Sequence, residues 1–110
     1  MTTYTFHNDP GHGWLEVGRD ELAMLHIDDQ ISHYSYTKGD KVYLEEDCDA
    51  SLFINALENL GVKFTFNSIT SNGDSPIRFM KRYTKGPKVC HHLALFTWIL
   101  MKSWRNLLKS

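Results

Sequence analysis

The chain has 110 residues, a formal net charge of −1, 42% hydrophobic residues and 13% aromatic residues. This composition excludes a disordered or low-complexity protein, and the length is that of one domain. The charge is divided unevenly, since residues 1–75 carry all 13 acidic residues with four basic ones, while residues 76–110 carry eight basic residues and no acidic one. Such asymmetry predicts either that the basic segment folds back over an acidic body or that each part faces a partner of opposite charge.

The first elements expected are two strands joined by a tight turn. Apolar residues alternate within Thr2 to His7, and Trp14 to Val17 is typical of the returning strand. The intervening Asn8-Asp9-Pro10-Gly11 predicts a type II turn, in which proline presets φ and glycine supplies a positive φ. A short helix is expected over Arg19 to His26, because two acidic residues fall in its first turn.

A second hairpin and a longer helix are expected in the middle of the chain. Ser32 to Thr37 and Lys41 to Glu46 alternate as two strands around a glycine-containing turn. Asp49 has the side chain of an N-cap, and Ala50 to Leu60 carries apolar residues at helical spacing. Gly61 suits the left-handed position that ends such a helix.

The last third of the chain predicts strands followed by a helix. Val62 to Phe66 alternates as a strand, and Ile77 with Phe79 begins a last short strand. A helix is expected from Val89 to Leu108, with an apolar run at residues 93–101 that is too short to span a bilayer. This helix could cover the sheet, dock into a partner, lie on a membrane surface or form a homodimer.

Together these elements predict an α+β fold. We expect a small, mostly antiparallel sheet in the order β-β-α-β-β-α-β-(β), with helices on one face and a C-terminal helix. Residues 1–84 would form the core domain, and residues 85–110 a basic, apolar helix packed on the core or appended to it.

Two clusters carry candidate site residues. The acidic cluster, Glu45, Glu46, Asp47 and Asp49, could meet a basic protein surface, bind a divalent cation, or be a solvated strand end before a capped helix. Cys48 within it is poorly placed for a reactive thiolate, because neighbouring anions raise a thiol pKa. Tyr43 lies on the preceding strand and completes this part of the expected interaction surface.

The first hairpin carries the second cluster. His7, Asp9 and His12 are weak candidates for a metal site, since no standard ligand spacing is present. The alternative is that Asp9 caps the turn and that the two histidines, with Trp14, form a recognition surface or an architectural corner. Neither a cofactor nor a catalytic set follows from these residues, which favour a binding protein over an enzyme.

A basic segment follows, with cations interleaved by aromatic residues. Such a segment could track a nucleic-acid backbone, but the acidic remainder of the chain argues against direct nucleic-acid binding. Its members are Arg78, Lys81, Arg82, Lys85 and Lys88.

Three motifs carry a resemblance to known proteins. D-P-G-H-G-W-L-E-V at 9–17, I-S-x-Y-S-Y at 31–36 and V-Y-L-E-E-D-C-D at 42–49 resemble a family of small, largely uncharacterised proteins of phages and other mobile elements. The resemblance covers roughly residues 4 to 80 and brings no catalytic assignment.

The resemblance implies an accessory protein that acts in the cytoplasm of a bacterial host. Its expected action is to inhibit or redirect a host protein, such as an anti-CRISPR-like defence target or a nucleic-acid-handling complex, through an acidic face. The alternatives are a small metal-dependent enzyme built on the His7, Asp9 and His12 hairpin and an interaction module built on the C-terminal helix.

Overall fold

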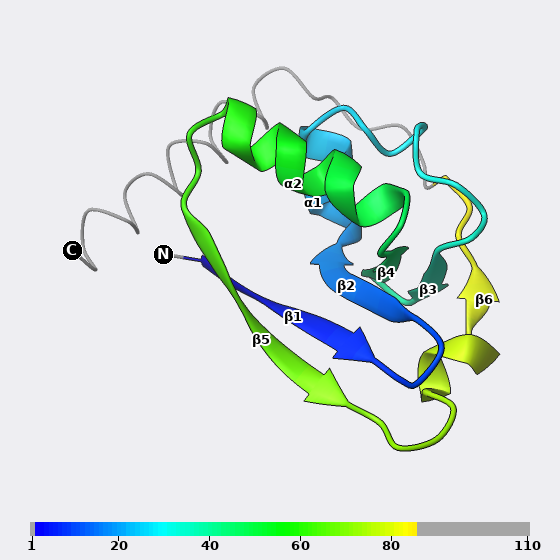
Figure 1. Cartoon of the computed structure of the whole chain (residues 1–110). Coiled ribbons are helices and arrows are strands. Elements are labelled where there is room, and N and C mark those ends of the chain that lie inside the picture. Colours follow the sequence, from blue (N-terminus) through cyan, green and yellow to red (C-terminus); the bar gives the residue numbers. More distant parts are fainter. Residues whose placement is uncertain (1, 86–110) are drawn as a thin grey trace.

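The computed structural model describes residues 2–85, which form one sheet with two helices against it (Figure 1). The six strands lie in the order β5-β1-β2-β4-β3-β6. The elements in chain order are β1 (Thr2–Asn8), β2 (Gly13–Gly18), α1 (Arg19–Met24), β3 (Tyr36–Lys38), β4 (Lys41–Glu45), α2 (Asp49–Asn59), β5 (Phe64–Thr70), the 3-10 helix η1 (Pro76–Phe79) and β6 (Lys81–Arg82).

The sheet is mixed, so the predicted small, mostly antiparallel sheet is wrong. β5 returns from α2 and pairs parallel with β1 over seven residue pairs, while the β1–β2, β2–β4, β3–β4 and β3–β6 pairs are antiparallel. A parallel neighbour requires a crossover connection, and here α2 supplies it between β4 and β5. The alternation in β5 predicts a strand but does not indicate which strand it pairs with.

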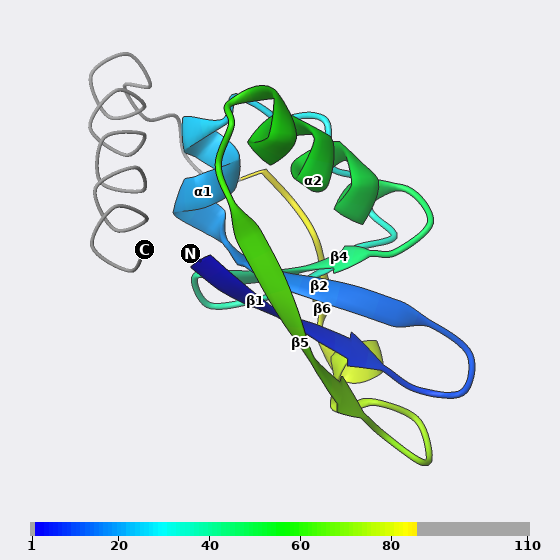
Figure 2. The ribbon, with the colours of Figure 1, turned by 60° about the vertical axis from the view of Figure 1, so that its left-hand side comes forward.

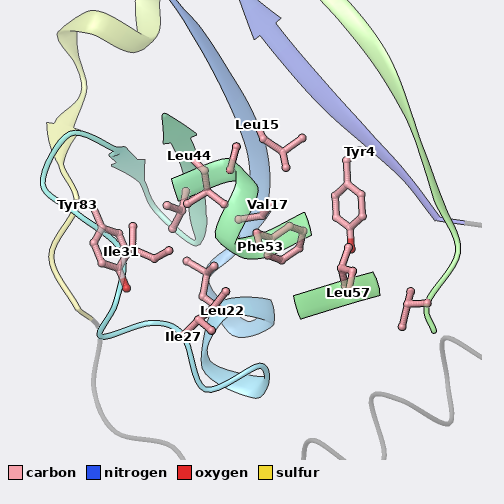
Figure 3. Packing of buried hydrophobic residues seen from close by; sticks show 13 residues of the cluster. Tyr4, Leu15, Val17, Leu22, Ile27, Ile31, Leu44, Phe53, Leu57 and Tyr83 are labelled. Carbon is pink, nitrogen blue, oxygen red and sulfur yellow. The ribbon is translucent and has the colours of Figure 1, made fainter. Parts of the chain in front are cut away.

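Both helices lie on the same face of the sheet, where the main core is (Figures 2 and 3). Alternate strand residues such as Leu15, Val42 and Leu44 point toward α1 and α2 and are fully buried or nearly so. Phe53 of α2 is fully buried and meets the ring of Tyr4 edge-on, with centroids 5.3 Å apart. Burial of each such large apolar side chain contributes about 1.5–3 kcal/mol to folding.

The opposite face of the sheet carries a second, smaller cluster beneath η1. Trp14, Tyr36 and Ile77 are its buried members. Ser75 caps η1 by accepting a hydrogen bond from the backbone of Ile77, and Pro76 occupies the first turn. These two residues explain why the predicted strand at 77–79 is instead a 3-10 helix, since both favour a helical start.

Two local predictions in the hairpins are wrong. Gly11 does not have a positive φ, because the turn is held by the Asp9 side chain and is not of type II. Residues 32–35 precede β3 as a turn, which leaves Tyr34 outside the strand and 55% exposed. By contrast, the first hairpin, the helix at α2 and the positive φ of Gly61 are confirmed.

The expected C-terminal helix and Lys88 lie outside the described residues. Within residues 2–85, no helix is both long and apolar enough to cross a membrane.

Candidate functional site

Asp9 joins the first hairpin to the segment that carries η1. One carboxylate oxygen, Oδ1, accepts hydrogen bonds from the backbone amides of Gly11 and His12, at 3.0 and 2.9 Å. Oδ2 accepts from the backbone of Ser75 at 2.9 Å and from Nε of Arg78 at 2.6 Å, while Nη2 of Arg78 donates to Oδ1. Asp9 therefore caps its own turn, which is the non-metal alternative from the sequence. It also anchors Arg78, 69 residues away along the chain.

This bidentate pair leaves Asp9 no role as a general base or a metal ligand. The Arg78 guanidinium holds the pKa of the Asp9 carboxyl well below its usual range. Desolvation acts in the opposite direction, and hydrogen bonds from three backbone amides lower the pKa further. The same pair raises the pKa of Arg78. Arg78 also lies over the Trp14 ring, 5.3 Å from its centroid, so its charge is both compensated and held against an aromatic face.

A cleft of about 430 Å³ lies beside this pair, on the face of the sheet opposite α1 and α2. We call it the aromatic cleft. Its lining brings together residues of the first hairpin, the β4–α2 loop and the basic segment. The lining residues are His12, Trp14, Tyr34, Tyr36, Glu45, Asp47, Cys48, Arg78 and Arg82.

The aromatic residues of the cleft differ in how accessible they are. Trp14 is 2% exposed and meets Tyr36 edge-on, with centroids 6.3 Å apart, so it supports the cleft from within. Tyr34 and His12 are exposed and offer their rings to a ligand. Of the two alternatives from the sequence, Trp14 fits the architectural corner and not the recognition surface, whereas His12 lies at the surface.

The acidic side of the cleft is formed by Glu45 and Asp47, and together with the intervening Glu46 they form what we call the acidic loop. The Glu45 carboxylate accepts hydrogen bonds from the backbone amides of Asp47 and Cys48, at 3.0 and 3.1 Å, which fixes the loop. Glu46 and Asp47 are exposed. Desolvation and then the nearby carboxylates raise the pKa of the Cys48 thiol, which confirms that this thiol is not activated.

The basic side of the cleft is Arg82 of β6. Its guanidinium lies 4.4 Å from the centroid of the Tyr36 ring and donates a long 3.4 Å hydrogen bond to the Tyr34 carbonyl. Lys81 and Lys85 of the same segment are exposed and do not line the cleft. The basic segment therefore divides, with Arg78 and Arg82 at the cleft and the two lysines directed elsewhere.

Asp49 does not belong to the acidic surface, contrary to the sequence interpretation. It is 3% exposed and lies at the start of α2, where Cys48 holds the N-cap position. Its Oδ2 accepts hydrogen bonds from the amide and hydroxyl of Ser32 and from the hydroxyl of Ser35. The Ser35 hydroxyl in turn accepts a hydrogen bond from the backbone amide of Glu45. Asp49 therefore connects the segment that carries Tyr34 to the end of β4 that carries Glu45, and both segments line the cleft.

His7 and Tyr43 lie on the same face of the sheet as the cleft, opposite α1 and α2, but belong to a different contact. Nε2 of His7 and Oε1 of Glu16 are 2.9 Å apart, and the His7 ring meets the Tyr43 ring edge-on with centroids 5.6 Å apart. Desolvation and the charge of Glu16 raise the pKa of Tyr43. Since His7 pairs with Glu16 and Asp9 with Arg78, the weak metal candidates His7, Asp9 and His12 are not brought together. Among residues 2–85, no group of three or more His, Cys, Asp or Glu side chains is placed to hold a metal ion.

Three contributors to the site were not identified from the sequence. Tyr34 and Tyr36 were interpreted as alternating strand residues, and Ser35 carried no signal beyond its position between them. The pairing of Asp9 with Arg78 also gave no local signal, because 69 residues separate the two partners. The one available hint was the charge asymmetry, which allowed the basic segment to fold back over the acidic body.

Comparison of the chain with protein-family models, with curated proteins and with solved structures finds no match.

Proposed function

We propose that this chain is a binding protein of the phage or mobile-element type, which inhibits or redirects a protein of its bacterial host. The single observation that supports this proposal best is the fixed acidic loop beside the aromatic cleft. A recognition site of this kind needs exposed charge, an accessible aromatic ring and a rigid frame, and it needs no catalytic group.

The charge balance of the cleft favours a cationic partner group. Arg78 is neutralised by Asp9, so the charges left to act on a ligand are Glu45, Asp47 and Arg82. Two carboxylates against one guanidinium leave the cleft net negative, which attracts a basic surface and repels an anionic one.

The shape of the cleft suits a lysine or arginine side chain from the partner. Its aliphatic stem or guanidinium plane would stack on Tyr34, and its charged end would reach the acidic loop. Host proteins that handle nucleic acid carry surfaces rich in these side chains, which fits a defence or nucleic-acid-handling complex as the target. This proposal keeps the sequence-based acidic face but removes Asp49 from it.

A pull-down from host lysate with matched charge-reversal variants tests the proposal. Glu46→Lys with Asp47→Lys should abolish capture of a specific basic protein, whereas Asp29→Lys with Glu58→Lys changes the net charge equally at exposed sites away from the cleft. Equal capture by both double variants would remove the acidic loop from the interface. Asp49 must be left unchanged, because its substitution perturbs the fold and not the surface.

Arg82→Ala supplies a second test, because its effect on capture should differ in direction between a basic and an anionic partner. Removal of this cation should strengthen capture of a basic partner, since among the described lining residues Arg82 is the cation that no carboxylate compensates. If capture weakens instead, Arg82 recognises an anionic group and the proposed partner chemistry is wrong.

A further inference from the structure

The two edges of the sheet differ sharply in how they are protected. β6, at one edge, has two residues, Lys81 and Arg82, and both are charged. Short length and positive charge are the usual means by which proteins keep an edge strand from pairing with another chain. β5, at the other edge, has seven residues and none of them is charged.

β5 has none of the features that block an edge. Its sequence, FTFNSIT, contains no proline, and it pairs with β1 in unbroken register from Phe64 opposite Thr2 to Thr70 opposite Asn8. No bulge therefore turns the strand away. Among residues 2–85 no strand pairs with its outer side, so a row of backbone donors and acceptors faces outward there.

The side chains of β5 add apolar surface on both faces of the same edge. Phe66 aligns with Tyr4 on the helix face and is 45% exposed, while Ile69 aligns with His7 on the other face and is 54% exposed. A strand added to this edge would satisfy the backbone groups and cover both side chains at once. A helix would leave this row of backbone groups unpaired.

We propose that the outer edge of β5 pairs antiparallel with β5 of a second copy of this chain, so that one continuous sheet runs through the dimer. A two-fold axis perpendicular to the sheet makes the two strands antiparallel and the contact self-complementary. The uncharged sequence permits this, because no like charges oppose one another across the pair. Two copies meeting at β6 would instead place lysines and arginines against each other. This inference does not depend on the aromatic cleft.

Analytical ultracentrifugation of the full chain over a dilution series tests the proposal. The wild-type chain should show a concentration-dependent dimer, and Asn67→Lys should raise its dissociation constant by about tenfold or more, because each strand then carries a charge into the pair. Asn55→Lys is the matched control, since it makes the same change on the exposed surface of α2 and should leave dimerisation unchanged.

A charge exchange guards against a variant that merely misfolds. Asn67→Lys and Asn67→Glu should each sediment as monomers with the circular dichroism of the wild type, and their mixture should restore a dimer. If Asn67→Lys does not fold, Ser68→Lys replaces it at the neighbouring exposed position. A wild-type chain that is monomeric throughout the series, or a dimer that these substitutions leave intact, overturns the proposal.

Discussion

Replacement of Asp49 by alanine should destabilise the protein severely, although the residue lies within an acidic, surface-like sequence. The change removes the shared acceptor of three hydrogen bonds from Ser32 and Ser35. It also leaves the fully buried hydroxyl of Ser35 without that acceptor. A hydrogen bond to a charged group contributes about 1.5–3 kcal/mol, and leaving a buried donor without a partner costs about 1–3 kcal/mol. Because the three bonds share one carboxylate and are not additive, we expect a loss of about 3–4 kcal/mol in the free energy of unfolding.

Urea denaturation followed by circular dichroism measures this loss. Asp49→Asn keeps an acceptor of the same shape and should lose about 1–2 kcal/mol, which keeps the measurement possible if the alanine variant unfolds. Asp47→Ala, two residues away and exposed, should change the stability by no more than about 0.5 kcal/mol. If Asp49→Ala stays within about 1 kcal/mol of the wild type, Asp49 does not hold the loop at 32–35 and the reasoning is refuted.

Three further stability predictions follow from single contacts. Asp9→Asn should be less stable than the wild type above about pH 4, where the ionised Asp9 pairs with Arg78. Because the pKa of Asp9 is lowered in the folded protein, the difference in the free energy of unfolding should shrink as the pH falls below this value. A difference that does not depend on pH would exclude the pair with Arg78 as its source. Burial raises the pKa of Tyr83 to about 12, so the folded state should lose stability as the pH rises from about 10 toward 12. Tyr83→Phe should reduce that alkaline loss in denaturation curves and leave the part due to Tyr43, whose pKa is also raised, whereas equal losses in both proteins would contradict it. Gly61→Ala should cost about 1 kcal/mol in urea unfolding because φ is +71° there, while Gly73→Ala, with open space around it, should be close to neutral; equal effects would show that the left-handed backbone carries no cost.

The sequence predicts those parts of the fold that depend on neighbouring residues. The first hairpin, α2 and the left-handed Gly61 each follow from alternation, helical spacing or a turn residue within a few positions. The parallel pairing of β5 with β1 does not, because alternation defines the two faces of a strand and carries no information on which strand lies beside it. The mixed sheet could therefore not be read from the pattern of Phe64 and Phe66.

The candidate site was predictable in its residue types and not in its assembly. Glu45 and Asp47 were expected at an acidic surface and do line the cleft. Asp49 was expected beside them, but the same short carboxylate that suits an N-cap also suits a buried acceptor, and its Ser32 and Ser35 partners lie in a turn that alternation represented as a strand. The residue types predict the acidic cluster at 45–49, but the packing of the loop determines which of its carboxylates reach solvent.

The proposed function requires that the aromatic cleft and the acidic loop accept a basic side chain. An amide NMR titration of the full chain with a short oligoarginine peptide tests it most directly, with inorganic phosphate as the anionic comparison. We expect the peptide shifts to concentrate at His12, Tyr34 and residues 45–48, and phosphate to leave these signals unchanged. Glu46→Lys with Asp47→Lys should abolish the response. Shifts of equal size around Asp29 and Glu58, or a response of the cleft to phosphate and not to the peptide, would contradict it.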